Sequence, residues 1–299
     1  MKNIDIDRIS INDRRFCITY PMRDDVLLSS IKKTGIIQPV MLLDTTPYVI
    51  ITGFKRALLA KQAGFTKIPC VIKNISEKDA LLYNIHDNIR RGLNIVEKAI
   101  GIEKMLYMGF HLAEIHEVMT LLSLDPHEKI IERLTAVAGM EDTLKDFVIT
   151  KNLAMKSVEM LIRLNPEDRT QIIDIFASMH TTESFIREIL ELLNLVKIKK
   201  GTIDFNFIKD VTEAQELKKR LKKLTNPILI SLEEELKQIK LRCALPPDID
   251  IKVDPFFEKG YIDMVIRAKS EEEAKSAIEK LNAILSMGYI RSIIELTKG

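Results

Sequence analysis

A strand, a glycine turn and a helix follow one another in residues 48–64, YVIITGFKRALLAKQAG. The apolar run 48–51 predicts a strand, because β-branched and aromatic residues make it up. Helical spacing over about 55–63 predicts a helix, which ends at a glycine suited to the left-handed conformation common there. Gly53 lies at the turn between them, and this strand–turn–helix unit decides the fold of the amino-terminal third.

The turn has the composition of an anion-binding site. Gly53 lets the backbone approach a phosphate closely, because it has no Cβ. A helix N-terminus offers unpaired N–H groups and the positive end of the helix dipole. Lys55 and Arg56 add two positive charges beside it. The alternative is a simple turn followed by two solvated cations.

Further strands and helices surround this unit. Apolar runs predict strands at 40–43 and 68–72, and helical spacing predicts a helix over about 25–34 that Gly35 ends. Strands that alternate with short helices predict an α/β domain over residues 1–75.

After residue 75 the sequence pattern changes from alternating strands and helices to helical spacing, and the predicted fold class of the whole chain is α+β. Residues 76–196 have helical spacing with five breaks, which predicts six or seven helices in a DNA-binding region or any other small bundle. Residues 197–245 are predicted as a basic helical connector, beginning with a basic segment at 196–201. Residues 246–299 show two alternating runs and a helical run, which predict a small strand–strand–helix unit.

Three stretches in the amino-terminal third resemble the ParB/sulfiredoxin superfamily in order and spacing. The first is a helix that ends at a glycine before a Gln-Pro pair, the second resembles the family's Gly-Glu-Arg-Arg box, and the third its Glu-Asn-x-x-Arg box. They lie at Ser30–Val40, Ile51–Ala57 and Asp87–Arg91. The resemblance implies a ParB-like partition protein of chromosome or plasmid segregation, with a central helix-turn-helix region.

The resemblance also implies a cofactor site. ParB-like proteins hold the phosphates of CTP in the glycine turn, which implies nucleotide contacts from Gln38, Thr52, Gly53, Phe54, Lys55, Arg56, Asn88 and Arg91. Asp87 and Asn88 occupy the places of the family's magnesium ligands, and Mg²⁺ prefers oxygen ligands. The alternative for these two residues is a helix cap.

The sequence departs from the family pattern at the acidic residue of the second box. Phe54 stands there and can position neither metal nor water for hydrolysis. The third box has Asp87 where the family has Glu, and its spacing to the Leu93-Asn94 pair that follows it is one residue short of the family pattern. We therefore expect nucleotide binding with weak or absent CTPase activity.

The best helix-turn-helix candidate pairs a helix at about 111–122 with a second helix that Asp125 would cap and Pro126 would begin. Its candidate DNA-contacting residues are His127, Lys129 and Arg133. Two glutamates of the same helix nearly cancel their charge. The basic stretches Lys197–Lys200 and Lys218–Lys223 are a second route to DNA phosphates, unless they are simply solvated.

Composition limits the partners, the location and the kinds of site that we expect for the protein. The formal net charge is +2, from 45 basic and 43 acidic residues, which neither requires nor excludes nucleic acid. No apolar run approaches the roughly 20 residues that span a bilayer, and no apolar segment follows the first methionine. We expect no membrane association and a cytoplasmic, nucleoid-associated protein. Three cysteines without a CxxC pair predict neither a zinc site nor a disulfide framework.

The expected partners are DNA, a second copy of the chain as a homodimer, and a partner ATPase. Two other functions stay open. A small-molecule kinase of the same superfamily, acting for example on an amino acid, would need a general base and metal ligands. A nucleotide-gated protein scaffold without specific DNA binding would suit the nearly neutral candidate recognition helix.

Overall fold

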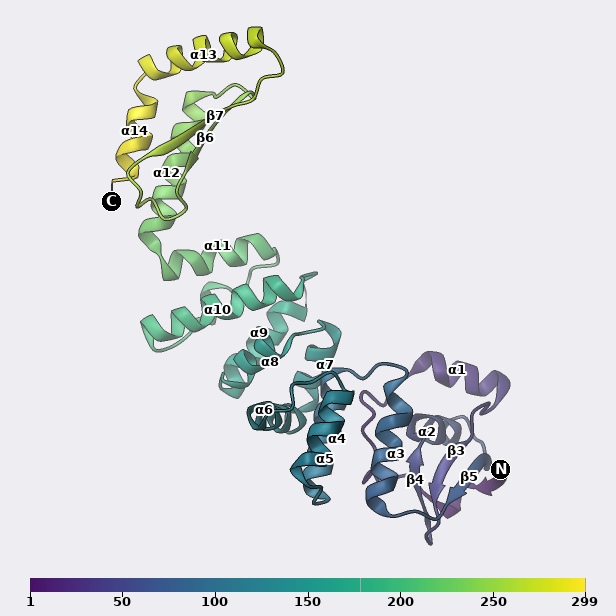
Figure 1. Ribbon diagram of the computed structural model, residues 1–299. Helices are drawn as coiled ribbons and strands as arrows, with labels where there is room; N and C mark the ends of the chain where they lie inside the picture. The colour runs from purple at the N-terminus through teal and green to yellow at the C-terminus, as the bar shows by residue number, and fades with distance from the viewer. Residues whose placement is uncertain (178, 299) are drawn as a thin grey trace. The chain divides into compact units, whose positions relative to one another are not determined.

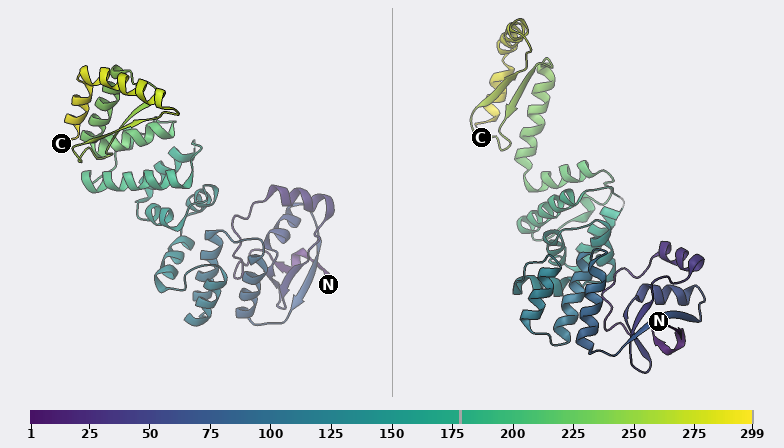
Figure 2. Two further views of the ribbon diagram at one scale, coloured as in Figure 1. Left: turned by 45° about the horizontal axis from the view of Figure 1, so that its top comes forward. Right: turned by 45° about the vertical axis from the view of Figure 1, so that its right-hand side comes forward.

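The computed structural model describes residues 1–177 and 179–298 (Figures 1 and 2). The fold class is α+β, as predicted. The chain forms two compact units, residues 1–173 with 182–187, and residues 174–181 with 188–299. Within the described residues, no helix is both long and apolar enough to span a membrane.

A five-stranded mixed sheet forms the amino-terminal part of the first unit. Its strands are β1 (Lys2–Asp5), β2 (Ile9–Ser10), β3 (Val40–Leu43), β4 (Tyr48–Thr52) and β5 (Lys67–Lys73). Their order is β1-β5-β3-β4-β2, with β3 parallel to β5 and antiparallel to β4. The three predicted strands are confirmed. The sequence did not reveal β1 and β2, because β1 buries a single apolar residue, Ile4, and β2 has two residues.

Three helices accompany this sheet (Figure 1): α1 (Asp25–Thr34), α2 (Phe54–Gln62) and α3 (Glu77–Ile89). A short 3-10 turn, η1 (Ile6–Arg8), joins β1 to β2. The predicted helices 25–34 and 55–63 are confirmed to within one residue. The central strands provide the core, because their side chains at Val40, Leu42, Ile50, Ile51, Ile68 and Cys70 are fully buried.

A β-bulge at the end of β4 links the sheet to α3. Met41 pairs with Thr52 and Leu42 with Ile50, which leaves Ile51 as the extra residue. The buried Asn84 of α3 donates its Nδ2 hydrogen to the carbonyl of Ile51 at 2.6 Å. This bond fixes α3 against the strand that leads into Gly53.

The helical part that follows begins within the first unit. Its helices are α4 (Ile95–Tyr107), α5 (Leu112–Leu121), α6 (Glu128–Ala138), α7 (Asp142–Thr150), α8 (Met155–Ile162) and α9 (Pro166–Ala177). Four of the five predicted breaks, at Gly92, Gly109, 123–126 and Gly139, fall between helices, whereas Pro166 of the fifth begins α9. The predicted start of α6 at Asp125 and Pro126 is wrong: His127 is the N-cap, and its ring Nδ1 accepts from the Lys129 N–H at 3.3 Å.

The remaining elements are α10 (Glu183–Lys200), η2 (Phe205–Phe207), α11 (Ala214–Thr225), α12 (Pro227–Cys243), β6 (Ile249–Val253), β7 (Ile262–Ile266), α13 (Glu271–Ser286) and α14 (Tyr289–Leu296). The segment 196–201, predicted to begin the connector, is instead the last turn of α10 and its end. Lysines are good helix formers and are favourable at the negative helix C-terminus, and Gly201 ends the helix with a φ of 78°.

The carboxy-terminal part of the second unit has its own small core. β6 and β7 form an antiparallel hairpin that pairs Ile251 with Met264. Side chains from α12, β6, α13 and α14 pack together there: Ile239, Cys243, Ile251, Ile284, Ile290 and Ile293. The predicted strand–strand–helix unit is confirmed. Only α14 was missed, and it follows Gly288 at a positive φ of 81°.

Replacing Asn84 with alanine should lower the free energy of unfolding by about 1–3 kcal/mol, because the carbonyl of Ile51 loses its buried donor. Lys61→Ala, at an exposed position of α2, should change it by less than about 0.5 kcal/mol. Urea denaturation followed by circular dichroism measures both variants. Equal effects would contradict the anchoring role of Asn84.

Candidate functional site

A cavity of about 1100 Å³ opens at the amino-terminal end of α2, with residues of α1 and α3 in its walls. Its lining residues are Thr19, Asp24, Leu27, Gln38, Gly53, Phe54, Lys55, Arg56, Asp79, Leu82, Tyr83, His86, Asp87, Asn88, Arg90 and Arg91. The structure thus brings together all the residues predicted for nucleotide and metal except Thr52. That residue is buried at the end of β4 and does not line the cavity.

Gly53 is the N-cap of α2 and makes the turn into the cavity wall. Its φ of 92° lies in the left-handed region that favours glycine. A Cβ at this position would lie 3.2 Å from Nη2 of Arg56. The first N–H groups of α2 follow directly, and such groups have no acceptor within their own helix. The turn therefore combines close backbone access with available donors.

Lys55 is held at the cavity by an aspartate from another element. Its Nζ lies 3.4 Å from Oδ2 of Asp24, and both side chains are partly buried. The other carboxylate oxygen of Asp24 accepts from the Leu27 N–H at 3.0 Å and so caps α1. Lys55 is thus oriented, but its charge is already partly neutralised.

Arg56 is more deeply placed than Lys55. Its Nη1 donates to the carbonyls of Gln38 at 2.6 Å and Pro39 at 3.1 Å. Burial lowers the pKa of the Arg56 guanidinium, and the charge of Asp87 opposes this shift. These contacts hold the guanidinium beside Gly53, where a phosphate on the turn would meet it.

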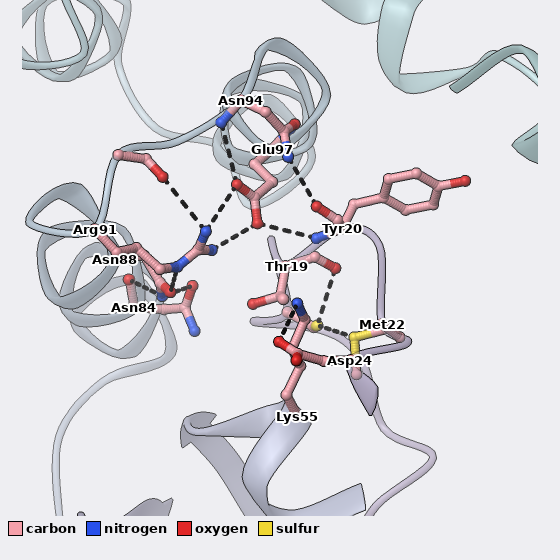
Figure 3. A network of polar contacts seen from close by, with 12 residues as sticks. Thr19, Tyr20, Met22, Asp24, Lys55, Asn84, Asn88, Arg91, Asn94 and Glu97 are labelled. Carbon is pink, nitrogen blue, oxygen red and sulfur yellow. Dashed lines mark hydrogen bonds and ion pairs between the residues drawn. The ribbon is translucent and has the colours of Figure 1, made fainter. Parts of the chain in front are cut away.

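A chain of hydrogen bonds runs along the end of α3 (Figure 3). Asn88 donates from Nδ2 to the Asn84 carbonyl at 2.8 Å, and its Oδ1 accepts from Nε of Arg91 at 2.9 Å. Arg91 also forms a two-pronged ion pair with Glu97 of α4, at 3.0 and 2.5 Å. The predicted phosphate-contacting Arg91 is therefore engaged with the protein's own carboxylate.

Phe54 follows Gly53 and contributes to the cavity wall, but its side chain is 3% exposed. It belongs to the buried face of α2, together with Ala57 and Ala60. An aromatic ring in this place offers no oxygen to a metal ion or to water. What Phe54 gives the cavity is apolar surface and a backbone N–H at the helix start.

Sequence reasoning missed several lining residues. Tyr83 and His86 of α3 and its C-cap Arg90 follow the spacing of three and four residues that places side chains on one face of a helix, and this spacing could have indicated them together with the predicted Asp87. Asp24 had the signal of a residue just before a predicted helix, but its approach to Lys55 is a tertiary contact. Nothing in the local sequence marks Thr19.

The predicted metal ligands Asp87 and Asn88 both line the cavity. Among the described residues, no group of three His, Cys, Asp or Glu side chains could hold a metal ion by itself. Mg²⁺ in nucleotide sites commonly takes one or two protein oxygens, with phosphate oxygens and water as the rest. The donor set of Asp87 and Asn88 fits that kind of shared site.

Of the candidate DNA-contacting residues, His127 is the N-cap of α6, Lys129 lies in its first turn and Arg133 lies at its middle. His127, Lys129 and Arg133 are all exposed. Arg133 pairs through Nε with Glu159 of α8 at 3.1 Å, and its side chain is partly exposed. These three side chains are therefore accessible, and the positive charge of Arg133 is partly neutralised within the protein.

Residues 1–89 match the family model of the ParB N-terminal domain. The chain is 29% identical over 229 residues to a probable chromosome-partitioning protein ParB of Vibrio cholerae, and the match covers 74% of each protein. A ParB of Neisseria meningitidis is 40% identical over 82 residues, which are 26% of this chain and 29% of that protein. The nucleoid occlusion protein of Bacillus cereus is 23% identical over 177 residues, which are 56% of this chain and 60% of that protein.

Two crystal structures of C-terminally truncated ParB from Caulobacter crescentus are also similar to the chain. The complex with CTP-gamma-S is 18% identical, has a TM-score of 0.27 and covers 58% of this chain and 96% of that one. The complex with the centromeric parS site is 15% identical, has a TM-score of 0.35 and covers 64% of this chain and 99% of that one. The chain carries a ParB N-terminal domain and is a distant homologue of chromosome-partitioning ParB proteins and of the nucleoid occlusion protein.

Two glycine substitutions test the close approach at the turn. Gly64→Ala should cost about 1–2 kcal/mol of unfolding free energy, because it forces a positive φ on alanine while its Cβ meets nothing within 4 Å. Gly53→Ala should cost more, because its Cβ also displaces the Arg56 guanidinium. Urea denaturation of both variants measures the difference. A smaller loss for Gly53→Ala would contradict the tight packing described.

Proposed function

We propose that this distant ParB homologue is a DNA-binding protein of chromosome or plasmid partitioning, or of a related regulatory process, and that it binds CTP as a conformational ligand. The observation that carries the proposal is the cavity at the start of α2. It gathers the Gly53 turn, the free N–H groups of a helix end, and the cations Lys55 and Arg56. A ligand of this kind acts by binding one conformation of the protein more tightly than another.

A nucleoside triphosphate suits the chemistry of the cavity. The helix N-terminus and the two cations provide donors and positive charge for several phosphate oxygens. A volume of about 1100 Å³ leaves room for a whole nucleotide. The choice of CTP rests on the three ParB-like motifs.

Magnesium would be held by Asp87 and Asn88 together with the phosphates. The ion would neutralise phosphate charge and fix the bend of the triphosphate. Asp87 provides the carboxylate and Asn88 the amide oxygen. That amide oxygen also accepts from Nε of Arg91.

Hydrolysis of the nucleotide is expected to be weak or absent. Phe54 stands where the family has an acidic side chain, and its ring is buried in the face of α2. The box therefore keeps what phosphate binding needs and lacks a carboxylate that could orient water or metal.

Each predicted domain of the chain has its own proposed role. Residues 1–75, with motif residues of α3, bind the nucleotide. The helical region to residue 196 contacts DNA through His127, Lys129 and Arg133 of α6 and its N-cap, and 197–245 connects it to the tail. A nucleoid-associated location follows from DNA binding, and a partner ATPase would serve partitioning.

A second copy of the chain is the proposed partner of the tail, residues 246–299. The hairpin of β6 and β7 has two strands in the described part of the chain, so its edges can accept another strand. Met264 of β7 is 42% exposed although it lies opposite the fully buried Ile251. A homodimer would cover this apolar face.

A nucleotide-gated scaffold is the second candidate. The pairing of Arg133 with Glu159 favours it, because it withdraws a cation from the candidate recognition helix. A superfamily kinase acting on an amino acid is a third reading, which the loss of the acidic box residue at Phe54 opposes.

The Lys55→Ala, Arg56→Ala double variant should lose CTP affinity by at least roughly a hundredfold, because two charge-assisted contacts of about 1.5–3 kcal/mol each are removed. Isothermal titration with CTP and Mg²⁺ measures this. Lys32→Ala, Lys33→Ala removes the same charge from exposed positions of α1 and should bind like the unchanged chain. Unchanged affinity in the Lys55, Arg56 variant would contradict phosphate binding at the Gly53 turn.

DNA binding should weaken steeply with salt, because each phosphate contact releases counterions. Lys129→Ala, Arg133→Ala should reduce the slope of log affinity against log salt by about 2, one per cation, while the Lys32, Lys33 variant keeps it. Fluorescence anisotropy from low to high salt, with and without CTP, measures both. CTP binding without DNA binding at low salt would favour the scaffold, and CTP consumption dependent on an amino acid would favour the kinase.

A further inference from the structure

Glu97 is a buried carboxylate at the edge of the nucleotide cavity. Its side chain is 1% exposed, whereas that of its partner Arg91 is 43% exposed and lines the cavity. Besides the two bonds from Arg91, its carboxylate accepts from the N–H of Tyr20 at 3.1 Å and of Asn94 at 3.2 Å. Four donors therefore surround this internal anion (Figure 3).

The Arg91 guanidinium is almost fully committed to the protein. Nε donates to Asn88, Nη1 to Glu97 and at 3.4 Å to the Gly92 carbonyl, and Nη2 to Glu97. A phosphate oxygen in the cavity would have to compete for these donors. The geometry of a carboxylate on a guanidinium is also that of a phosphate on a guanidinium, so the two anions are direct alternatives.

We propose that Glu97 is an autoinhibitory anion, which competes with the nucleotide phosphates for Arg91 and lowers the nucleotide affinity of the site. The inference deepens the proposed function and rests on it. Nucleotide binding transfers Arg91 from Glu97 to a phosphate, and Glu97 sets the affinity of the site without touching the nucleotide.

Glu97 can release Arg91 and still keep other hydrogen-bond donors on its carboxylate. It is the third residue of α4 and forms a capping box with Asn94, so its carboxylate lies at the positive end of the helix dipole. The N–H groups of Tyr20 and Asn94 stay on it when Arg91 leaves. These contacts reduce the cost of an uncompensated buried charge, which is otherwise large.

The same exchange prepares the magnesium ligand. Oδ1 of Asn88 accepts from Arg91, so a cation at this oxygen would lie next to the guanidinium. Departure of Arg91 from this position frees the oxygen. Arg91 lies after α3 in a turn that ends at Gly92 with a φ of 78°, and its exposed side chain has room to reorient.

Glu97→Gln should raise CTP affinity roughly tenfold in titrations with Mg²⁺, because a competent state populated at a few per cent in the unchanged chain becomes dominant. The gain should vanish when Arg91→Ala is added, since it operates through Arg91. Asp44→Asn is the matched control: it removes one negative charge at an exposed position after β3, outside the cavity lining. It should change affinity by less than about twofold.

The outcomes separate this inference from the proposed function. If the unchanged chain does not bind CTP, the proposed function falls and the inference with it. If the chain binds CTP, loses it in the Lys55, Arg56 variant, and gains nothing from Glu97→Gln, only the inference is overturned.

An Arg91→Lys variant decides the matter if Glu97→Gln does not fold. Lysine keeps the charge for phosphate but loses the paired bonds to Glu97, so its CTP affinity should equal or exceed that of the unchanged chain. A melting temperature lowered together with a clear loss of affinity would show that the ion pair builds the site, and would overturn autoinhibition.

Discussion

The positive φ of Gly53 is the constraint on which the amino-terminal domain and its cavity depend. It turns the chain from the buried strand β4 directly into α2, so that a helix N-terminus and two cations meet at one point. The bulge at Ile51, held by Asn84, fixes α3 on the other side of this turn. The turn at Gly53 thus orients one wall of the cavity, and the neighbouring bulge orients the other.

Local sequence signals were sufficient for much of this arrangement. The strands at 40–43 and 48–51, the helix at 25–34 and the turn at Gly53 each have residues whose conformational preferences agree with the fold. The order of the three motifs predicts that residues of α2 and α3 share one site, and both helices line the cavity. Short strands such as β2 and the N-cap at His127 depend on tertiary pairing or on a single side-chain bond, which the periodicity of apolar residues does not report.

The charges of the cavity could not be predicted from sequence in the same way. Lys55 pairs with Asp24 from 31 positions earlier, and Arg91 pairs with Glu97, which lies in the next helix. A motif marks these cations as phosphate ligands, but the folded protein supplies them with internal anions. In the proposed function, nucleotide binding is therefore an exchange of partners, in which buried charges must stay compensated. Such an exchange gives the ligand a means to select one conformation over another.

The central claim is that the start of α2 receives the phosphates of a nucleotide. Hydrogen exchange of the Phe54 and Lys55 amides, measured with and without CTP and Mg²⁺, tests it most directly. The account predicts that CTP slows exchange at these two amides, because helix-terminal N–H groups that lack an internal acceptor gain phosphate oxygens. Unchanged exchange there, with CTP bound and protection elsewhere in the chain, would contradict it.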